Sequence, residues 1–402
     1  MALIVQKFGG SSVANAEKIF NVASRVADAY DAGNSVVVVV SAQGDTTDDL
    51  IEKAAEINTK PSKREMDVLL STGEQISIAL LAMALEKMKY PVVSLTGWQV
   101  MMKTNSTYGS ARIEKIDTSR ILSEIDKNRI VVVAGFQGIN GIGDITTLGR
   151  GGSDTSAVAL AAALKADLCE IYTDVDGVYT ADPRIVKNAQ KLDDISYDEM
   201  LELASLGANV LHNRSVELAK KYNVDLEVKS SFERVPGTKV KEAGTVEKML
   251  IRGVTRDNDV ARISIVGIED TPGMAYKIFS ALSKKNINVD LILQSIGRQN
   301  KKDISFTVSK GHLDEALKVL EDIRNIIKAD HIDHREDVSK VSIVGAGMTS
   351  NPGVAALMFE ALYEAGINIH MISTSEIKVS VLVNEANAEK AVGAVHTKFF
   401  GE

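Results

Sequence analysis

The chain lacks several features that would assign it to a particular class of protein. It has one cysteine, Cys169, in 402 residues, which excludes an intrachain disulfide and favours a reducing compartment. No apolar run approaches the roughly 20 residues that cross a bilayer, and the start, MALIVQKFGG, lacks the basic region and apolar core of a signal peptide. The net charge of -8, without a long Lys/Arg run, argues against nucleic acid as the main partner. We therefore expect a cytoplasmic protein that binds neither nucleic acid nor a membrane.

Common nucleotide-binding and metal-binding motifs are also missing. No Gly-Lys dipeptide occurs, which excludes the phosphate loop that ends in Lys-Ser/Thr. The stretch VGAGMTSNPG, residues 344–353, approaches a dinucleotide fingerprint but lacks its third glycine, which favours a structural turn. His331 and His334 lie in a charged stretch typical of a solvated loop, and His212 is better placed to pack or cap near a helix start than to act as a base. We expect no metal-binding residues.

The sequence does contain enough apolar residues for two or three domains. Hydrophobic residues make up 45% and charged residues 25% of the chain, as in soluble globular proteins. Unbroken apolar runs at 36–40, 130–133 and 168–172 predict strands that are covered on both faces. Helical patterns alternate with these runs, at 16–30, 65–87, 153–164 and 197–206. The alternation predicts an α/β/α sandwich with a mostly parallel sheet, which we expect over residues 1–245.

The C-terminal part of the chain contains an internal repeat. The segment ARISIVGIEDTPGMAYKIFSALSKKNINVDLILQS (261–295) returns as SKVSIVGAGMTSNPGVAALMFEALYEAGINIHMISTS (339–375). Each copy predicts a strand, a Pro-Gly turn, a helix and two further strands, with a last helix after them. We therefore expect two small ferredoxin-like βαββαβ domains, at 258–332 and 338–402.

Four stretches of the N-terminal half carry glycines and polar residues at predicted strand-to-helix junctions or on the helix that follows. They are VQKFGGSS, VVSAQGDTTDDL, LLSTGEQISIAL and TLGRGGSDTSAV. In the first, Lys7 with Gly9 and Gly10 can present an ammonium and backbone N–H groups to one anion. Ser153 alone is explained as an N-cap and Glu74 as a first-turn charge. Because ligands gather at the carboxyl ends of strands in open α/β sheets, the four stretches together predict a site.

Five motifs connect these stretches with a known family. KFGGSS, SAQGDTTD, STGEQIS, GRGGSDTSAVALAAAL and YTDVDGVYTADPR occur in this order before the two repeats. In this arrangement the chain resembles, over essentially its whole length, the aspartate kinases of the amino acid kinase family, and the repeats resemble ACT domains, which bind amino-acid effectors. The resemblance implies transfer of the γ-phosphoryl group of ATP, with Mg²⁺, to the side-chain carboxylate of L-aspartate. The product would be 4-phospho-L-aspartate, in the first step towards lysine, threonine and methionine.

The resemblance also implies roles for individual residues. Lys7 would stabilise charge on the transferred group, and Asp154 would hold Lys7 in place. Arg150 would bind the substrate α-carboxylate with its planar fork, and Glu74 the α-ammonium. The rest of the acceptor pocket would be formed by Ser41, Thr47, Gly151, Gly152 and Ser153. The implied nucleotide-binding residues are Lys7, Phe8, Gly9, Gly10, Thr173, Asp174, Tyr179, Asp182 and Arg184.

The repeats imply regulation and assembly. Backbone N–H groups at the helix start of each copy can take the carboxylate of an amino acid. The implied effector-binding residues are Asp270, Gly273, Ala275, Gln294, Asn368, Ile369 and Ser375. Lysine, threonine or both are expected to inhibit the enzyme. We also expect a homo-oligomer, at least a dimer, that pairs through the ACT repeats.

The sequence departs from the family pattern in one motif. Many relatives have Gly-Ala-Lys-Val-Leu-His-Pro where this chain has GANVLHN, so Asn209 and Asn213 replace a lysine and a proline. If that lysine helps to hold ATP, this chain binds nucleotide more weakly or uses Lys229 or Arg234 instead. Met249 lies where some relatives start a separate regulatory subunit. Two alternatives stay open: an amino acid kinase that acts on glutamate or acetylglutamate, and a non-catalytic amino-acid sensor.

Overall fold

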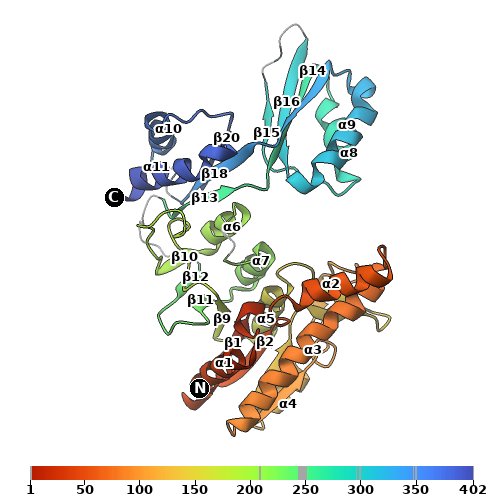
Figure 1. Cartoon of the computed structure of the whole chain (residues 1–402), viewed down its shortest axis with the longest axis vertical. Coiled ribbons are helices and arrows are strands. Elements are labelled where there is room, and N and C mark those ends of the chain that lie inside the picture. Colours follow the sequence, from red (N-terminus) through yellow and green to blue (C-terminus); the bar gives the residue numbers. More distant parts are fainter. Residues whose placement is uncertain are drawn as a thin grey trace. The chain divides into compact units, whose positions relative to one another are not determined.

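The computed structural model describes residues 2–207, 210–242, 251–295, 297, 300–346, 348 and 351–401, so Asn209 and Met249 lie outside the described residues. The chain forms two compact units. Of the described residues, the first unit contains 2–178, 191–204 and 210–242. The second contains 179–190, 205–207 and the described residues from 251 to 401 (Figure 1).

An eight-stranded sheet forms the centre of the first unit, with the strand order β10-β12-β11-β9-β1-β2-β6-β3. Its strands are β1 (Leu3–Phe8), β2 (Ser35–Val40), β3 (Val92–Leu95), β6 (Ile130–Ala134), β9 (Leu168–Thr173), β10 (Asp194–Ser196), β11 (Leu226–Ser230) and β12 (Thr238–Lys241). All neighbours pair in parallel except β11 and β12. The mostly parallel α/β fold predicted from the sequence is therefore confirmed.

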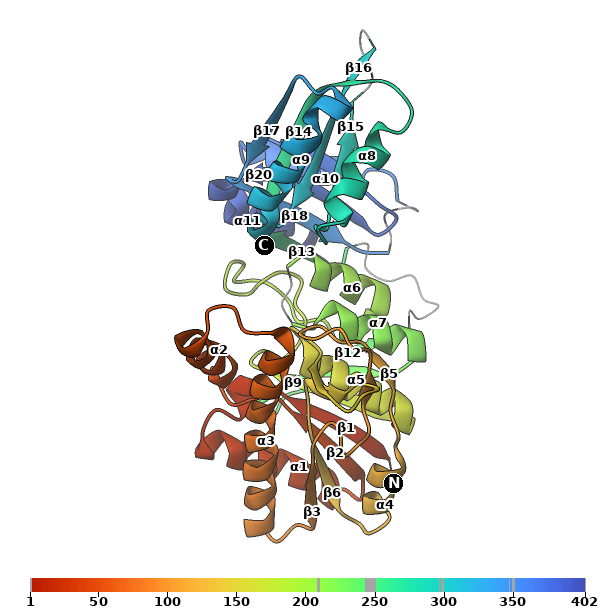
Figure 2. The same cartoon turned by 90° about the vertical axis from the view of Figure 1, so that its right-hand side faces the viewer.

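Helices cover both faces of this sheet (Figure 2). The helices of this unit are α1 (Ala16–Asp31), α2 (Thr46–Ile57), α3 (Lys63–Lys87), α4 (Ser119–Ile125), α5 (Gly152–Leu164), α6 (Tyr197–Ser205) and α7 (Asn213–Tyr222). Of these, α2 packs against α3 and not on the sheet. Phe8 packs with α1 and α3 in one core, whereas its neighbour Lys7 reaches α5. Successive side chains of a strand point to opposite faces, so α1 and α3 lie on one face and α5 on the other. A small second sheet has the order β5-β4-β7-β8, with β4 (Lys103–Thr104), β5 (Ile113–Lys115), β7 (Gln137–Ile139) and β8 (Ile145–Thr147).

The helix α3 is, among the described residues, the one helix that is long and apolar enough to cross a membrane by length and composition alone. Half of its most apolar window is buried inside the protein. Ile78, Leu81 and Leu85 of this helix belong to the core that contains β2 and β6. These are the properties of a core helix in a globular unit.

The first repeat forms a four-stranded antiparallel sheet in the second unit, with the order β15-β16-β14-β17. Its elements are β14 (Ala261–Glu269), α8 (Met274–Ser283), β15 (Ile292–Gln294), β16 (Lys301–Val308), α9 (Leu313–Ile327) and β17 (His331–Arg335). Their order along the chain is βαββαβ. This confirms the ferredoxin-like fold predicted for the copy.

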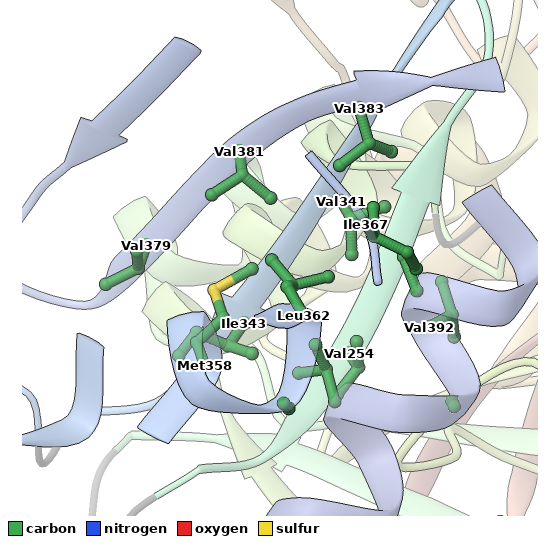
Figure 3. Close-up of a cluster of buried hydrophobic side chains, with 14 of the residues drawn as sticks. Val254, Val341, Ile343, Met358, Leu362, Ile367, Val379, Val381, Val383 and Val392 are labelled. Atoms are coloured by element: carbon green, nitrogen blue, oxygen red, sulfur yellow. The ribbon is translucent and has the colours of Figure 1, made fainter. Parts of the chain in front are cut away.

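The second repeat forms a similar sheet, with the order β13-β18-β20-β19. Its elements are β13 (Gly253–Asp257), β18 (Val338–Val344), α10 (Val354–Glu364), β19 (Met371–Thr374), β20 (Lys378–Asn384) and α11 (Ala388–Phe400). The strand β13 precedes the whole first repeat but pairs antiparallel with β18. Val254 of β13 lies in the buried core of this repeat together with Met358, Leu362 and Val392 of the two helices (Figure 3). The second repeat therefore takes one strand from upstream of the first repeat.

The structure shows where three histidines named from the sequence lie. His212 caps the start of α7, where its side chain accepts a hydrogen bond from the N–H of Arg214, as the capping interpretation predicted. Asn213 is the first residue of that helix, a position where proline is also favoured. The loop predicted around His331 and His334 is wrong, because both lie in the edge strand β17. The polar side chains there gave no apolar alternation from which a strand could have been predicted.

Candidate active site

Three central strands of the first unit end at the same edge of the sheet. Phe8 of β1 pairs in register with Val40 of β2 and with Tyr172 of β9, and both pairings are parallel. The carboxyl ends of the strands therefore lie side by side. Ser41 and Thr173, which were predicted as site residues, lie at this edge.

The glycines after β1 allow two loops to approach closely. The carbonyl oxygen of Gly10 accepts a hydrogen bond of 3.0 Å from the N–H of Gly44 in the loop after β2. A Cβ atom at Gly10 would lie 2.7 Å from the carbonyl oxygen of Ala42. No larger residue fits here without moving backbone, so Gly10 is required by the packing of the two loops.

The ammonium of Lys7 forms an ion pair with Asp154. The distance between Nζ and Oδ1 is 2.7 Å, and the two side chains are 11% and 13% exposed. Asp154 stands in the first turn of α5, where a negative charge is favoured. The pair therefore places a nearly buried, oriented cation at the carboxyl edge of the sheet.

A buried carboxyl group lies close to the same edge. Oε1 of Glu74, on α3, accepts a hydrogen bond of 3.0 Å from the N–H of Ala42, whereas Oε2 has no hydrogen-bond partner among the described residues. Burial raises the pKa of Glu74 to about 8. Gly73 lets α3 come this close, because a Cβ there would lie 2.7 Å from the Cβ of Ala42. In the free protein Glu74 is mainly neutral at pH 7, and a cationic group beside Oε2 would favour its ionised form.

The loop before α5 exposes Arg150 between two glycines with left-handed backbone conformations. The φ angles of Gly149 and Gly151 are 79° and 64°. A Cβ at Gly151 would lie 2.1 Å from the ring of His212. The loop therefore depends on glycine both for its conformation and for its close contact with the start of α7.

Two side chains that the sequence did not single out, the buried Asp67 and the half-buried Arg214, hold this loop in place. Asp67 of α3 accepts hydrogen bonds from the N–H and hydroxyl of Thr147 and from the N–H of Gly109. The guanidinium of Arg214 donates to the carbonyl oxygen of Leu148 at 3.0 Å. The partners of Asp67 lie 42 and 80 residues further along the chain, so nothing local in the sequence distinguishes it from a surface charge.

The other predicted acceptor residues surround the start of α5 or lie on neighbouring loops. Gly152 is the first residue of α5, and Ser153 is buried. A Cβ at Gly135 would lie 2.8 Å from the Oγ of Ser153, so the loop after β6 also approaches this helix start closely. Ser41 and Thr47 are half-buried, the first directly after β2 and the second in the first turn of α2.

The predicted nucleotide-binding residues divide between the two units. Thr173 and Asp174 belong to the first unit, where the hydroxyl of Thr173 donates to Asp174 at 3.1 Å. The side chain of Phe8 is fully buried and stacks on Tyr172 with ring centroids 4.5 Å apart, so only its backbone is available to a ligand.

The other three nucleotide candidates lie on the segment 179–190, which belongs to the second unit. Arg184 donates to both carboxylate oxygens of Asp182, and this hydrogen bonding lowers the pKa of Asp182. Tyr179 is the first residue of the segment. The structure therefore places Tyr179, Asp182 and Arg184 in the unit that also contains the repeats.

Lys229 and Arg234, the possible substitutes for the missing lysine, both have acidic partners. Lys229 forms an ion pair of 2.9 Å with Glu170, and Arg234 pairs with Asp28. All four line a cavity of about 470 Å³ between α1 and the strands β1, β9 and β11. Because each of the two cations already pairs with a carboxylate, neither is readily available to replace the missing lysine.

The predicted effector-binding residues lie on the surface of the two repeats. All of them are exposed except the half-buried Ile369: Asp270, Gly273, Ala275, Gln294, Asn368 and Ser375. Gly273 caps the start of α8 with a φ of 93°, whereas Asp270 already pairs with Lys302 at 2.9 Å. An effector ammonium would have to compete with Lys302 for Asp270.

Comparison with known proteins connects this geometry with a family. The family model of the amino acid kinases matches residues 2–230, and an ACT domain model matches residues 263–323 and 341–399. The chain belongs to the amino acid kinase family. This amino acid kinase is 53% identical over 400 residues to an aspartokinase from Bacillus sp. (strain MGA3), covering 99% of the present chain and 97% of the relative. It is 52% identical to aspartokinase 2 from Bacillus subtilis (strain 168), over 99% and 98% of the two chains.

Solved structures agree with this classification. The structure of E. coli aspartokinase III in complex with aspartate and ADP, in the R-state, has a TM-score of 0.84 and 26% identity, covering 99% of this amino acid kinase and 100% of that chain. The T-state complex of the same E. coli enzyme with lysine and aspartate has a TM-score of 0.77 and 25% identity, with 99% of both chains covered. Within its family, the chain is an enzyme of the aspartate kinase group.

Proposed function

We propose that this kinase transfers the γ-phosphoryl group of ATP to the side-chain carboxylate of L-aspartate. An oxygen of that carboxylate attacks the γ-phosphorus, ADP leaves, and 4-phospho-L-aspartate forms as the first intermediate towards lysine, threonine and methionine. The observation that carries the proposal is the ion pair of Lys7 with Asp154 at the carboxyl edge of the sheet. Phosphoryl transfer depends mainly on positioning and on neutralising charge, and an oriented ammonium can do both. The complex of E. coli aspartokinase III with aspartate and ADP supports the same substrate pair.

The acceptor amino acid would be held by opposite charges at its two ends. The α-ammonium would lie against the free Oε2 of Glu74. The α-carboxylate would accept two hydrogen bonds from the planar guanidinium of Arg150. The remaining contacts would come from the start of α5 and two neighbouring loops, that is from Gly151, Gly152, Ser153, Ser41 and Thr47. This arrangement leaves the side-chain carboxylate as the group that faces Lys7.

The nucleotide would be bound by two sets of residues. The first is the end of β1 and β9 with the backbone of their loops: Lys7, Phe8, Gly9, Gly10, Thr173 and Asp174. The second is the segment that carries Tyr179, Asp182 and Arg184. No group of three acidic, histidine or cysteine residues that could hold a metal occurs in the described ranges, which fits a Mg²⁺ ion that arrives on ATP and keeps most of its waters. Asp174 and Asp182 are the residues that would contact the metal–phosphate shell, where Mg²⁺ would supply positive charge against the charge of the phosphates.

Feedback control and assembly would belong to the ACT repeats. Lysine, threonine or both would bind the repeats at Asp270, Gly273, Ala275, Gln294, Asn368, Ile369 and Ser375 and inhibit the enzyme. The lysine complex of E. coli aspartokinase III in its T-state supports this assignment. We place the enzyme in the cytoplasm as a homo-oligomer that pairs through these repeats.

The decisive experiment is a substrate comparison. Release of ADP is measured with L-aspartate and with L-glutamate, each with and without Mg²⁺. We expect release that depends on aspartate and on Mg²⁺, because glutamate would carry its carboxylate one methylene too far. Equal rates with the two amino acids would contradict the assignment and support a kinase of the glutamate type, and no release with either would support a non-catalytic sensor.

A further inference from the structure

The segment from Tyr179 to Gln190 is a loop that belongs to the second unit, although the chain on both sides of it belongs to the first. The chain enters it from Val178 and leaves it at Lys191, which both belong to the first unit, whereas the segment itself belongs to the second. The N–H of Thr180 donates to the carbonyl oxygen of Gln190, and the N–H of Gln190 donates to the Oγ1 of Thr180, both at 2.9 Å. The two ends of the loop therefore hold each other.

Thr180 also connects this loop to the second repeat through hydrogen bonds. Its carbonyl oxygen accepts a hydrogen bond of 2.8 Å from the N–H of Val254 in β13, and its hydroxyl lies 2.9 Å from the Nε2 of His396 in α11. Thr180 is 1% exposed and His396 is fully buried. Because Oγ1 already accepts from Gln190, the hydroxyl proton is available to the ring nitrogen, which matches a neutral ring whose pKa is lowered by burial.

Apolar contacts secure the same loop. Ala181 and Val186 belong to the buried core of the second repeat, the core drawn in Figure 3 with Val254 and Val392. The carbonyl oxygen of Asp182 accepts hydrogen bonds from the N–H groups of Ile185 and Val186. The pair of the half-buried Asp182 and the exposed Arg184 therefore lies on a turn whose other side is part of the core of the second repeat.

We propose that Thr180 and His396 are positioning residues for the nucleotide, through which the second repeat sets the place of Asp182 and Arg184. The inference rests on the proposed function, from which it takes that Asp182 and Arg184 bind ATP. A buried hydrogen bond that loses its partner is costly, so the loop follows β13 and α11 when either moves. The second repeat would therefore act on ATP binding, and much less on aspartate binding.

The test uses three variants of the full-length chain. Thr180→Val has the same shape and removes the hydroxyl, Thr180→Ser keeps the hydroxyl, and His396→Leu removes the ring nitrogen without leaving another acceptor. The affinity for ADP is measured by calorimetry without aspartate, and the KM values for ATP and for aspartate are measured separately. Loss of one buried hydrogen bond corresponds to roughly a tenfold change in an equilibrium constant. His396→Leu loses one such bond, and Thr180→Val loses two, because its hydroxyl also accepts from the N–H of Gln190. We expect His396→Leu to weaken ADP binding by about tenfold and Thr180→Val by at least as much, with an unchanged aspartate KM, and Thr180→Ser to bind ADP nearly as the wild type does.

A matched control removes a hydroxyl elsewhere in the second repeat. Ser380 of β20 shares a hydrogen bond of 2.7 Å with Ser342, and Ser380→Ala should leave ADP affinity unchanged. Unchanged ADP affinity in folded Thr180→Val and His396→Leu would overturn the inference, as would an equal loss in Ser380→Ala or an equal rise in aspartate KM. A wild-type chain that binds ADP but does not phosphorylate aspartate would contradict the proposed function alone, because the ADP measurement needs no acceptor.

Discussion

Glu74 combines a carboxyl group with one unused oxygen and almost no exposure to water. Its raised pKa means that the carboxyl is neutral over most of the range from its ordinary value up to about 8 and ionises as the pH rises through 8. The proposed partner, the substrate ammonium, needs the ionised form. Aspartate binding below pH 8 must therefore be coupled to loss of a proton.

This coupling gives a measurable proton count. At pH 7 we expect aspartate binding to release about one proton, because the ammonium lowers the pKa of Glu74 in the complex. Calorimetric titrations in two buffers with different ionisation enthalpies measure the number. Apparent aspartate affinity should rise as the pH rises towards 8. Glu74→Gln should bind aspartate more weakly and release no proton, and a wild type that releases none would rule out this role for Glu74.

Lys7 provides the sharpest test of the chemistry. The ammonium would act mainly on charge that develops in the transition state, so Lys7→Ala should lower kcat by roughly 10²-fold or more while aspartate KM changes little. Steady-state ADP release and a thermal melt check activity and folding together. Lys53→Ala, an exposed lysine on α2, is the control and should keep full activity. A folded Lys7→Ala enzyme with near wild-type kcat would show that another group neutralises the phosphoryl charge.

At the scale of elements, the loop Gly149–Gly151 tests the acceptor pocket. Gly151→Ala adds a Cβ at a φ of 64° and directs it into the ring of His212, so the start of α5 has to move. A shift of about 1 Å in a positioning element can cost up to 10²-fold in rate, and we expect aspartate KM to rise by roughly tenfold or more. Gly143→Ala is the matched control, because its φ is 90° with nothing within 4 Å of the added Cβ, so only the backbone strain remains. Equal effects of the two substitutions on aspartate KM would show that the loop does not position the acceptor amino acid.

Sequence patterns predicted four helices of the first unit well and most of the short elements poorly. The helices expected at 16–30, 65–87, 153–164 and 197–206 occur within two residues of those bounds, since each buries several apolar side chains over its length. The strands β3, β10 and β12 and the small sheet were not predicted, because two to four residues carry no period. The strand β11 and the helices α2, α4 and α7 were not predicted either. The strand β13 was missed as an element of the second repeat, because it lies outside the repeated sequence.

The site was predictable to a similar extent. Motif residues near the ends of β1 and β2 and on α3 and α5 could be named because glycine and charge at strand ends point to ligands. Asp67 and Arg214 could not be named, because only their distant partners reveal their role. The ion pair of Asp270 with Lys302 was equally hidden from the sequence.

At the scale of the whole molecule, the edges of the repeat sheets suggest where copies of the chain meet. The edge strands β15 and β19 expose Ile292, Leu293 and Ile372, at 54%, 47% and 42%. Exposed apolar edges of this kind are typical of association surfaces. Sedimentation of the full-length chain at micromolar concentration should therefore give at least a dimer.

A charge at this edge should weaken the assembly. Leu293→Lys is expected to shift the sedimentation profile towards the monomer, because a buried lysine without a partner is costly at an interface. Tyr276→Lys, on α8 and 77% exposed, is the control and should leave the profile unchanged. A wild-type monomer, or a dimer indifferent to Leu293→Lys, would contradict pairing through this edge.

The position of β13 has a consequence for the order in which the chain folds during synthesis. Gly253 pairs with Val344, so the strand leaves the ribosome long before its partner exists. The intervening first repeat has all six of its elements in one stretch and can close by itself. Pairing between distant segments is slow to form, because the loop between them must first be closed. We therefore expect the inserted first repeat to fold first. Its folding brings its two ends together, so β13 lies close to β18 when the last strands are synthesised.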